Sequence, residues 1–336
     1  MRRLILLVAF AAAGCGSTTP VPSTTWPAAD YTGLAVLEDG GVVLATSDTD
    51  GATQMLLAPS IGQRLSPITI PPTSCYAESR YGPQPFGYGG LAFIEICRHA
   101  PNQVPPDTAN IVAADFAHHA FTTLMQITTS GETENATFAL SPDAQRAYYD
   151  VGSGVCSGIA LATPTAAALP LPWTVASDGR QFRLDASPDL TRACGPDGQA
   201  ASPTLDPTGK TLAFLASPAS VGLTTFESRS HAAWRIFTTR LTDGRPDVAS
   251  AAVVEPGPIR WSPDGKWLAF VGIPAGQRGG LWVLNVEDHS IRLITAADVS
   301  VFAWERDSQR LLVAERIPQA STILRAVITE VTLPTP

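Results

Sequence analysis

The chain has 336 residues, of which 45% are hydrophobic and 7% aromatic. That content supports a sizeable core and excludes a generally disordered protein. Glycine and proline contribute 27 and 29 residues, whereas charged residues make up only 15%, a composition typical of turn-rich folds rather than long amphipathic helices. The net charge of −8 argues against nucleic acid as a main partner, because phosphate binding needs clustered lysine and arginine.

The start of the chain has the pattern of an export signal. Two arginines precede the apolar run Leu4–Ala13, which is too short to span a bilayer and has the length of a signal-peptide core. The run ends in Ala-Ala-Gly-Cys15, which resembles the lipobox of bacterial lipoproteins. That resemblance implies cleavage before Cys15 and a lipid on its side chain. We therefore expect residues 1–14 to be a lipoprotein signal peptide; the alternative is an ordinary secretory signal that is cut nearby.

The segment after Cys15 is rich in serine, threonine and proline, which is typical of a flexible linker. We expect residues 15–29 to be the lipidated cysteine and its tether, and residues 30–336 to be one folded domain. This arrangement predicts an exported protein that is lipid-anchored to the cell envelope, on its periplasmic or extracellular face.

The body of the chain repeats a hairpin unit. Its clearest copy is 259–271 (IRWSPDGKWLAFV), with related copies at 137–149, 203–215 and 301–313 and fainter ones at 33–45 and 86–96. In the Ser-Pro-Asp-Gly turn, proline presets φ, aspartate caps the turn and glycine takes a positive φ. After the clearest copy, GLWVLN and IRLIT form two further strand-like runs around a polar turn. Each repeat should therefore contain four strands.

Six turns divide the chain into units of similar size. The equivalent turn positions are Asp39, Gly89, Asp143, Thr208, Asp264 and Asp307, which are 50, 54, 65, 56 and 43 residues apart. Four-stranded units of this length must stack around an axis to bury their faces, and they match the β-propeller period. The Ser-Pro-Asp-Gly-Lys-x-Leu-Ala-Phe signature resembles the WD40-like repeats of TolB-type six-bladed propellers.

We therefore expect an all-β, TolB-like β-propeller with six four-stranded blades; an array of seven or eight blades is the alternative. The last repeat shows three clear strands. Its fourth strand would come from the segment just before Asp30, or from a fold within 322–333.

Four cysteines remain after Cys15: Cys75, Cys97, Cys156 and Cys194. An even number in an oxidising compartment favours two disulfides, and their spacing does not fit a zinc site. Bridges within one repeat need the least chain reorganisation, so we expect Cys75–Cys97 and Cys156–Cys194.

Motifs that would indicate catalysis are absent from the sequence. It contains no Gly-x-Ser-x-Gly and no complete phosphate-binding loop. His118 and His119 are adjacent, so on a strand they would point to opposite faces and could not share a metal; we expect them in a hairpin turn. We expect no catalytic residue, metal or cofactor. Six tryptophans should pack between blades: Trp173, Trp234, Trp261, Trp267, Trp282 and Trp304.

The resemblance to TolB-type propellers implies contacts with proteins. We expect a monomeric, non-enzymatic module that binds or scaffolds an envelope protein. The candidate contact is the insertion after the second strand of blade four, where Phe226, Arg229, His231 and Trp234 mix aromatic and arginine anchors; the alternative is a solvated loop without a partner. Two other functions stay open: a lyase or glycan hydrolase with a site at the channel mouth, and a solute-binding or sensor lipoprotein.

Overall fold

The computed structural model describes residues 26–47, 53–70, 77–98, 108–127, 137–151, 158–169, 174–177, 180–183, 199–217, 234–242, 246–254, 257–317 and 325–333. The ordered elements in these ranges are β-strands joined by turns. No helix in them is long and apolar enough to cross a membrane. The fold is therefore all-β, as the repeat pattern predicts.

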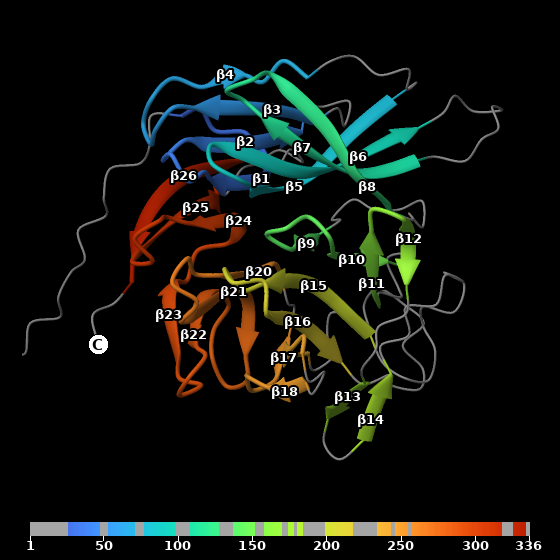
Figure 1. Cartoon of the computed structure of the whole chain (residues 1–336). Helices are drawn as coiled ribbons and strands as arrows, with labels where there is room; N and C mark the ends of the chain where they lie inside the picture. The colour runs from blue at the N-terminus through green and yellow to red at the C-terminus, as the bar shows by residue number, and fades with distance from the viewer. Residues whose placement is uncertain are drawn as a thin grey trace, which may run out of the picture.

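Six antiparallel sheets, the blades, surround a common centre (Figure 1). Blade 1 contains β1 (Asp30–Val36), β2 (Val42–Ser47), β3 (Thr53–Ala58) and β4 (Ser66–Pro67). Blade 2 contains β5 (Ala77–Pro85), β6 (Gly90–Arg98), β7 (Thr108–Asp115) and β8 (Ala120–Ile127). Blade 3 contains β9 (Phe138–Leu140), β10 (Ala147–Val151), β11 (Gly158–Thr163) and β12 (Ala166–Leu169).

The second half of the chain continues the same order. Blade 4 contains β15 (Gln199–Leu205), β16 (Thr211–Ser217), β17 (Arg235–Arg240) and β18 (Pro246–Val248). Blade 5 contains β20 (Ile259–Trp261), β21 (Trp267–Pro274), β22 (Gly280–Asn285) and β23 (Ile291–Thr295). Blade 6 contains β24 (Val299–Trp304), β25 (Arg310–Arg316) and β26 (Ala326–Thr332). In Figure 1, β9, β15, β20 and β24 lie around the middle, while β4, β12, β18 and β23 lie at the rim. The six-bladed prediction is confirmed.

Two features go beyond the expected four-stranded units. A separate hairpin of β13 (Thr174–Ser177) and β14 (Arg180–Arg183) forms its own two-stranded sheet between blades 3 and 4 in the chain order. In blade 5, β19 (Val253–Val254) pairs with the end of β21, and β20 pairs with its start. The two short strands therefore act as one inner strand that is interrupted after Val254.

The ring closes through the segment before β1, which is the first of the two closures expected from the sequence. The Ala29 N–H donates to the Ala326 carbonyl at 3.2 Å, and the Ala326 N–H donates to the Ala29 carbonyl at 2.8 Å. The Trp26 side chain is buried, and its Nε1 donates to the Gln63 carbonyl at 2.6 Å. The folded domain therefore includes Trp26 to Ala29, which the sequence analysis assigned to the flexible tether.

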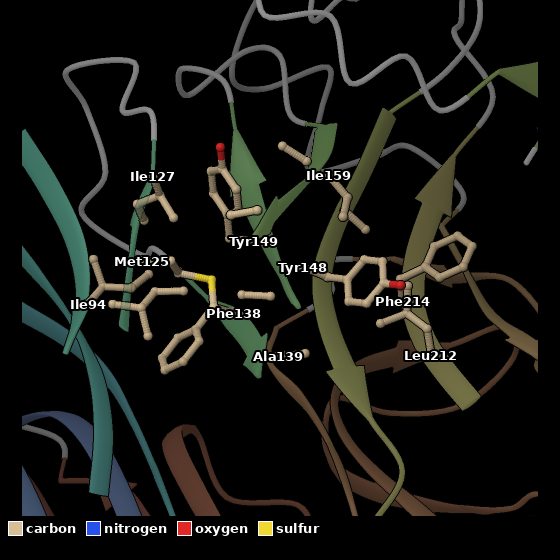
Figure 2. Packing of buried hydrophobic residues seen from close by; sticks show 14 of the residues in the cluster. Ile94, Met125, Ile127, Phe138, Ala139, Tyr148, Tyr149, Ile159, Leu212 and Phe214 are labelled. Carbon is tan, nitrogen blue, oxygen red and sulfur yellow. The ribbon is translucent and has the colours of Figure 1, made fainter. Parts of the chain in front are cut away.

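Adjacent blades bury apolar side chains against each other. Because neighbouring residues on a strand point to opposite faces, one strand serves two interfaces. Tyr148 and Tyr149 of β10 illustrate this: Figure 2 shows Tyr148 beside Phe214 of blade 4 and Tyr149 on the side of Ile127 of blade 2. All four belong to one hydrophobic cluster that joins blades 2, 3 and 4.

The described tryptophans pack as predicted between blades. Trp234, Trp282 and Trp304 are buried, and Trp261 and Trp267 pack against the same clusters. Two of them also tie inner strands together, because Trp261 Nε1 donates to the Thr204 carbonyl at 3.2 Å and Trp304 Nε1 donates to the Arg260 carbonyl at 3.1 Å. Trp173 lies outside the described residues.

Candidate functional site

The turn between the first two strands of a blade is built by its own side chains. In blade 5, Ser262 Oγ donates to the Asp264 carboxylate at 2.6 Å and accepts the Trp267 N–H at 3.0 Å. In blade 3, Ser141 forms the same pair with Asp143 at 2.5 Å. Satisfied polar groups of this kind fix one turn conformation, so the repeated motif produces rigid turns.

These turns contact each other from blade to blade. A Cβ on Gly209 of blade 4 would lie 2.5 Å from Pro142 Cδ of blade 3. The Asp264 N–H of blade 5 donates to Ser308 Oγ of blade 6 at 3.0 Å. The turns therefore lie together at one end of the ring, and we call this end the turn face. It comprises residues 37–41, 86–89, 141–146, 206–210, 262–266 and 305–309.

Blade 2 departs from the motif on this face. Its turn reads Phe86-Gly-Tyr-Gly89, and the Tyr88 side chain is 82% exposed. Beside it lies a hollow of about 180 Å³ that is lined by Phe86, Tyr88, Ala113 and Asp115, among others. An exposed tyrosine on a short glycine-flanked turn offers a large amphipathic contact surface, the kind enriched in protein interfaces.

The hairpin turn that borders this hollow carries the two adjacent histidines, as expected. His118 Nδ1 lies 2.7 Å from Asp115 Oδ2, and both side chains are exposed. The hydrogen bond from His118 lowers the pKa of Asp115. His119 takes a positive φ of 52°. These polar groups flank Tyr88 on the same blade, as a polar rim flanks an aromatic anchor.

Blade 6 departs from the motif in another way, because Glu305 stands where blade 5 has Ser262. Glu305 is only 5% exposed, and its Oε1 is buried without a hydrogen-bond partner among the described residues. Its Oε2 lies 2.9 Å from Arg310 Nη2. Arg310 also pairs with Asp307 at 2.7 Å and with Glu330 at 3.0 Å. Burial raises the pKa of Glu305 to about 7; the charges of Glu330 and Asp307 add to this increase, and Arg310 opposes it.

A third departure lies near the centre of the ring. Arg260 is half-buried on β20, the inner strand of blade 5, and its Nη1 donates to the Ile259 carbonyl at 3.1 Å. Desolvation lowers the pKa of Arg260, and the charge of Asp150 in blade 3 raises it. Asp150 itself accepts the Ser202 N–H of blade 4 at 2.8 Å and the Thr137 hydroxyl at 2.5 Å.

A wider hollow of about 500 Å³ lies between blades 1 and 2, at the end of β2 and the start of β3. Its lining is mostly uncharged, with Thr46, Ser47 and Gln54 among the residues. Among its described lining residues the one cation is Arg80, which lies 3.4 Å from Glu95.

Few of the site residues expected from the sequence lie among the described residues. Cys15, Phe226, Arg229 and His231 lie outside the described residues. Trp234 does not fit an exposed contact loop, because its side chain is 2% exposed and packs in the core between blades 4 and 5. That part of the expectation is corrected: Trp234 immediately precedes β17, the third strand of blade 4, and forms an isolated bridge with Val253.

The cysteine pairing stays a prediction. Cys97 is disulfide-bonded, while Cys75, Cys156 and Cys194 lie outside the described residues. Within the described part of the chain, no group of three or more histidine, cysteine, aspartate or glutamate residues is placed to hold a metal ion.

Sequence reasoning missed Tyr88, Glu305 and Arg260 as candidate functional residues. The signal that could have found them is their departure from the repeat. Tyr88 lies in a turn that lacks the Ser-Pro-Asp-Gly motif, Glu305 replaces the serine of blades 3 and 5, and Arg260 stands where three blades have alanine. A residue that breaks a repeated structural rule is a better candidate for function than one that obeys it.

No family model and no curated protein matches this sequence. Solved structures do match it in fold. TolB from Acinetobacter baumannii aligns with a TM-score of 0.53 and 11% identity over 86% of this chain and 63% of that chain, so this chain spans less than two thirds of that protein. A puromycin-hydrolyzing peptidase of Mycobacterium tuberculosis aligns with a TM-score of 0.50 and 13% identity over 93% of this chain and 55% of that chain. Identities this low establish the fold alone: the chain is a TolB-like six-bladed β-propeller.

Proposed function

We propose that this protein is a non-enzymatic envelope lipoprotein whose propeller binds another envelope protein through the turn face, with Tyr88 as the central anchor. The observation that carries the proposal is the 82% exposure of Tyr88 on a turn within a rigid ring of turns. Among the described residues, Tyr88 and Ile317 are the exposed large apolar side chains. A large exposed aromatic group at a fixed position supports a contact role.

The rigidity of the turn face supports binding because less conformational entropy is lost when a partner docks on it. The contacts between neighbouring turns, such as Asp264 with Ser308, hold the face in one shape before binding. The hollow beside Tyr88 would accept a small apolar side chain of the partner, since Phe86 and Ala113 contribute to its lining.

The lipid anchor is the second part of the proposal. A lipid at Cys15 would confine the propeller to a membrane surface, which raises the effective concentration of partners on that surface. Replacement of Cys15 by serine should move the protein from the detergent-extracted fraction to the soluble exported fraction. Unchanged partitioning of the Cys15→Ser variant would contradict the anchor and would leave the turn-face proposal standing.

Photo-crosslinking in intact cells tests the contact itself. A photoreactive amino acid at position 88 should give a discrete crosslinked product with an envelope protein. The matched control is position 317, which carries the other exposed large apolar side chain among the described residues. Ile317 follows the end of β25 in blade 6, at the end of the ring opposite the turn face. Equal products from both positions, or none from 88, would contradict the proposal. Turnover of glycans or peptides by the purified protein would contradict its non-enzymatic part.

A further inference from the structure

Charge is unevenly distributed over the turn face. In blades 3 to 6, the turn between the first two strands contains both an acidic residue and a cation. These are, in blade order, Asp143 and Arg146, Asp206 and Lys210, Asp264 and Lys266, and Asp307 and Arg306. The turn of blade 1 contains Glu38 and Asp39 without a cation, and residues 86–89 of blade 2 carry no charge. The part of the turn face formed by blade 1 is therefore acidic.

The two carboxylates of blade 1 have no counter-ion. Glu38 and Asp39 are exposed, and neither forms an ion pair with a described residue. Asp39 Oδ1 accepts the Gly41 N–H at 2.9 Å, as an aspartate in a turn commonly does. That hydrogen bond comes from a neutral amide, so it leaves the negative charge in place. Arg64, on the outer turn of the same blade, forms no ion pair with either carboxylate.

The corresponding carboxylates of blades 5 and 6 have cations beside them. Lys266 Nζ lies 3.9 Å from Asp264 Oδ2, and Arg310 Nε lies 2.7 Å from Asp307 Oδ2. Blade 1 breaks this pattern, because two adjacent negative charges stand there without a partner. Their mutual repulsion would be relieved by a positive charge from another molecule.

These charges lie next to the exposed tyrosine of blade 2. A Cβ on Gly89 would lie 3.2 Å from Asp39 Oδ2, so the Asp39 carboxylate lies against the residue that follows Tyr88. Asp115 is also close, since it lines the same hollow as Tyr88. Carboxylates around an exposed aromatic ring favour a cation, through charge-assisted hydrogen bonds and contact of the cation with the ring. We call residues 37–41, 86–89 and 115–119 the acidic sector.

We propose that the envelope protein bound by the turn face presents a lysine or arginine to Asp39 and Asp115, against the ring of Tyr88. This inference rests on the proposed function, because it names the chemistry of the partner at that surface. The small apolar side chain in the hollow would belong to a neighbouring residue of the same basic segment. Such charge complementarity speeds association and excludes acidic partners, and added salt weakens it.

An NMR titration of the full-length protein with two synthetic peptides tests the charge preference. The probe is acetyl-Ala-Lys-Ala-Arg-Ala-amide, and the reference is acetyl-Ala-Glu-Ala-Glu-Ala-amide. The basic peptide should shift the amide signals of the acidic sector and leave those of 206–210 and 262–266 in place. Its affinity should fall about 3-fold or more between about 10 mM and about 100 mM NaCl, as the Debye length falls from about 30 Å to about 10 Å. Equal shifts with the acidic peptide, or shifts spread over all six turns, would overturn the proposal.

A pair of double variants separates the acidic sector from net charge. Glu38→Gln with Asp39→Asn removes two charges and keeps an acceptor for the Gly41 N–H. It should weaken the basic peptide about 3- to 10-fold. The matched control, Glu287→Gln with Asp288→Asn, removes the same two charges from an exposed turn of blade 5, where Arg292 acts on Asp288. The control should bind like the wild type, and an equal loss in both double variants would overturn the proposal.

The protein crosslinked from position 88 separates this inference from the proposed function. Its Kd should rise about 3- to 10-fold with the Glu38→Gln, Asp39→Asn variant. An unchanged Kd would overturn the basic partner and leave binding through the turn face standing. A failure to obtain any product from position 88 would contradict the proposed function, whereas the peptide titration would still decide whether the acidic sector prefers a cation.

Discussion

Replacement of Glu305 by glutamine should stabilise the propeller above neutral pH and leave its stability near pH 4 unchanged. The substitution keeps the size and shape of the side chain and removes only the ionisable group. Glu305 is 5% exposed and has one buried oxygen without a partner among the described residues. Its ionised form is therefore poorly solvated, even though Arg310 lies 2.9 Å away.

The size of the effect follows from the pKa of Glu305, which burial raises from 4.5 to about 7. Because the folded state holds this proton more tightly than the unfolded state, the associated stability is fully present below about pH 4.5. It is lost as the pH rises through about 7. At 1.36 kcal/mol per pKa unit the loss is at most about 3 kcal/mol. Arg310 is 40% exposed, so solvent screening reduces the expected value to about 1–2 kcal/mol.

Urea unfolding of both proteins between pH 4 and pH 8 is the assay. The two free energies of unfolding should coincide near pH 4 and diverge as the pH rises through about 7, with Glu305→Gln about 1–2 kcal/mol more stable at pH 8. Glu330→Gln is the control background, since the charge of Glu330 contributes to the raised pKa of Glu305. In that background, the difference in the free energy of unfolding caused by Glu305→Gln should be smaller and should be complete at a lower pH. Parallel curves for the wild type and Glu305→Gln across this range would refute the reasoning.

Three further predictions concern the scaffold. Gly209→Ala should lower the free energy of unfolding by about 2–3 kcal/mol, since φ is +66° and the new Cβ would lie against Pro142. Gly62→Ala should lower it by about 1 kcal/mol, because φ is +79° there but the new Cβ would contact nothing. Ser262→Ala should cost about 1–2 kcal/mol because a fully buried hydroxyl with two hydrogen bonds is lost. Trp26→Ala should cost about 3–5 kcal/mol if the segment closes the ring. Urea unfolding checks each value, and a free energy unchanged within error would contradict it.

The sequence predicted the repeated part of the fold well, because the turn motif that marks each repeat in the sequence also forms the turn in the structure. The Asp264 side chain stabilises its hairpin turn by hydrogen bonds to residues two positions away. Such a turn can be predicted without knowing which distant segments meet. The strands GLWVLN and IRLIT coincide with β22 and β23 for the same reason: each is an apolar run that ends at a polar turn. Local chemistry of this kind repeats along the chain and is visible in it.

Features that depend on contacts between distant segments could not be predicted from the sequence. Trp26 lies in a linker-like stretch, and its burial depends on Gln63 of the first blade. The exposed or buried state of an aromatic residue is decided by its neighbours, so Tyr88 and Trp234 could not be told apart as surface anchor and core residue. The surroundings of Glu305 likewise arise only when β26 brings Glu330 close to it, although both residues belong to blade 6.

The central claim, that Tyr88 anchors an envelope partner on the turn face, is tested most directly by binding. The protein crosslinked from position 88 should be purified, and its Kd for the propeller should be measured with the wild type, Tyr88→Ala and Ile317→Ala. Loss of a central aromatic anchor should weaken binding about 10-fold or more, while Ile317→Ala should bind like the wild type. An unchanged Kd for Tyr88→Ala, with the fold intact, would contradict the account.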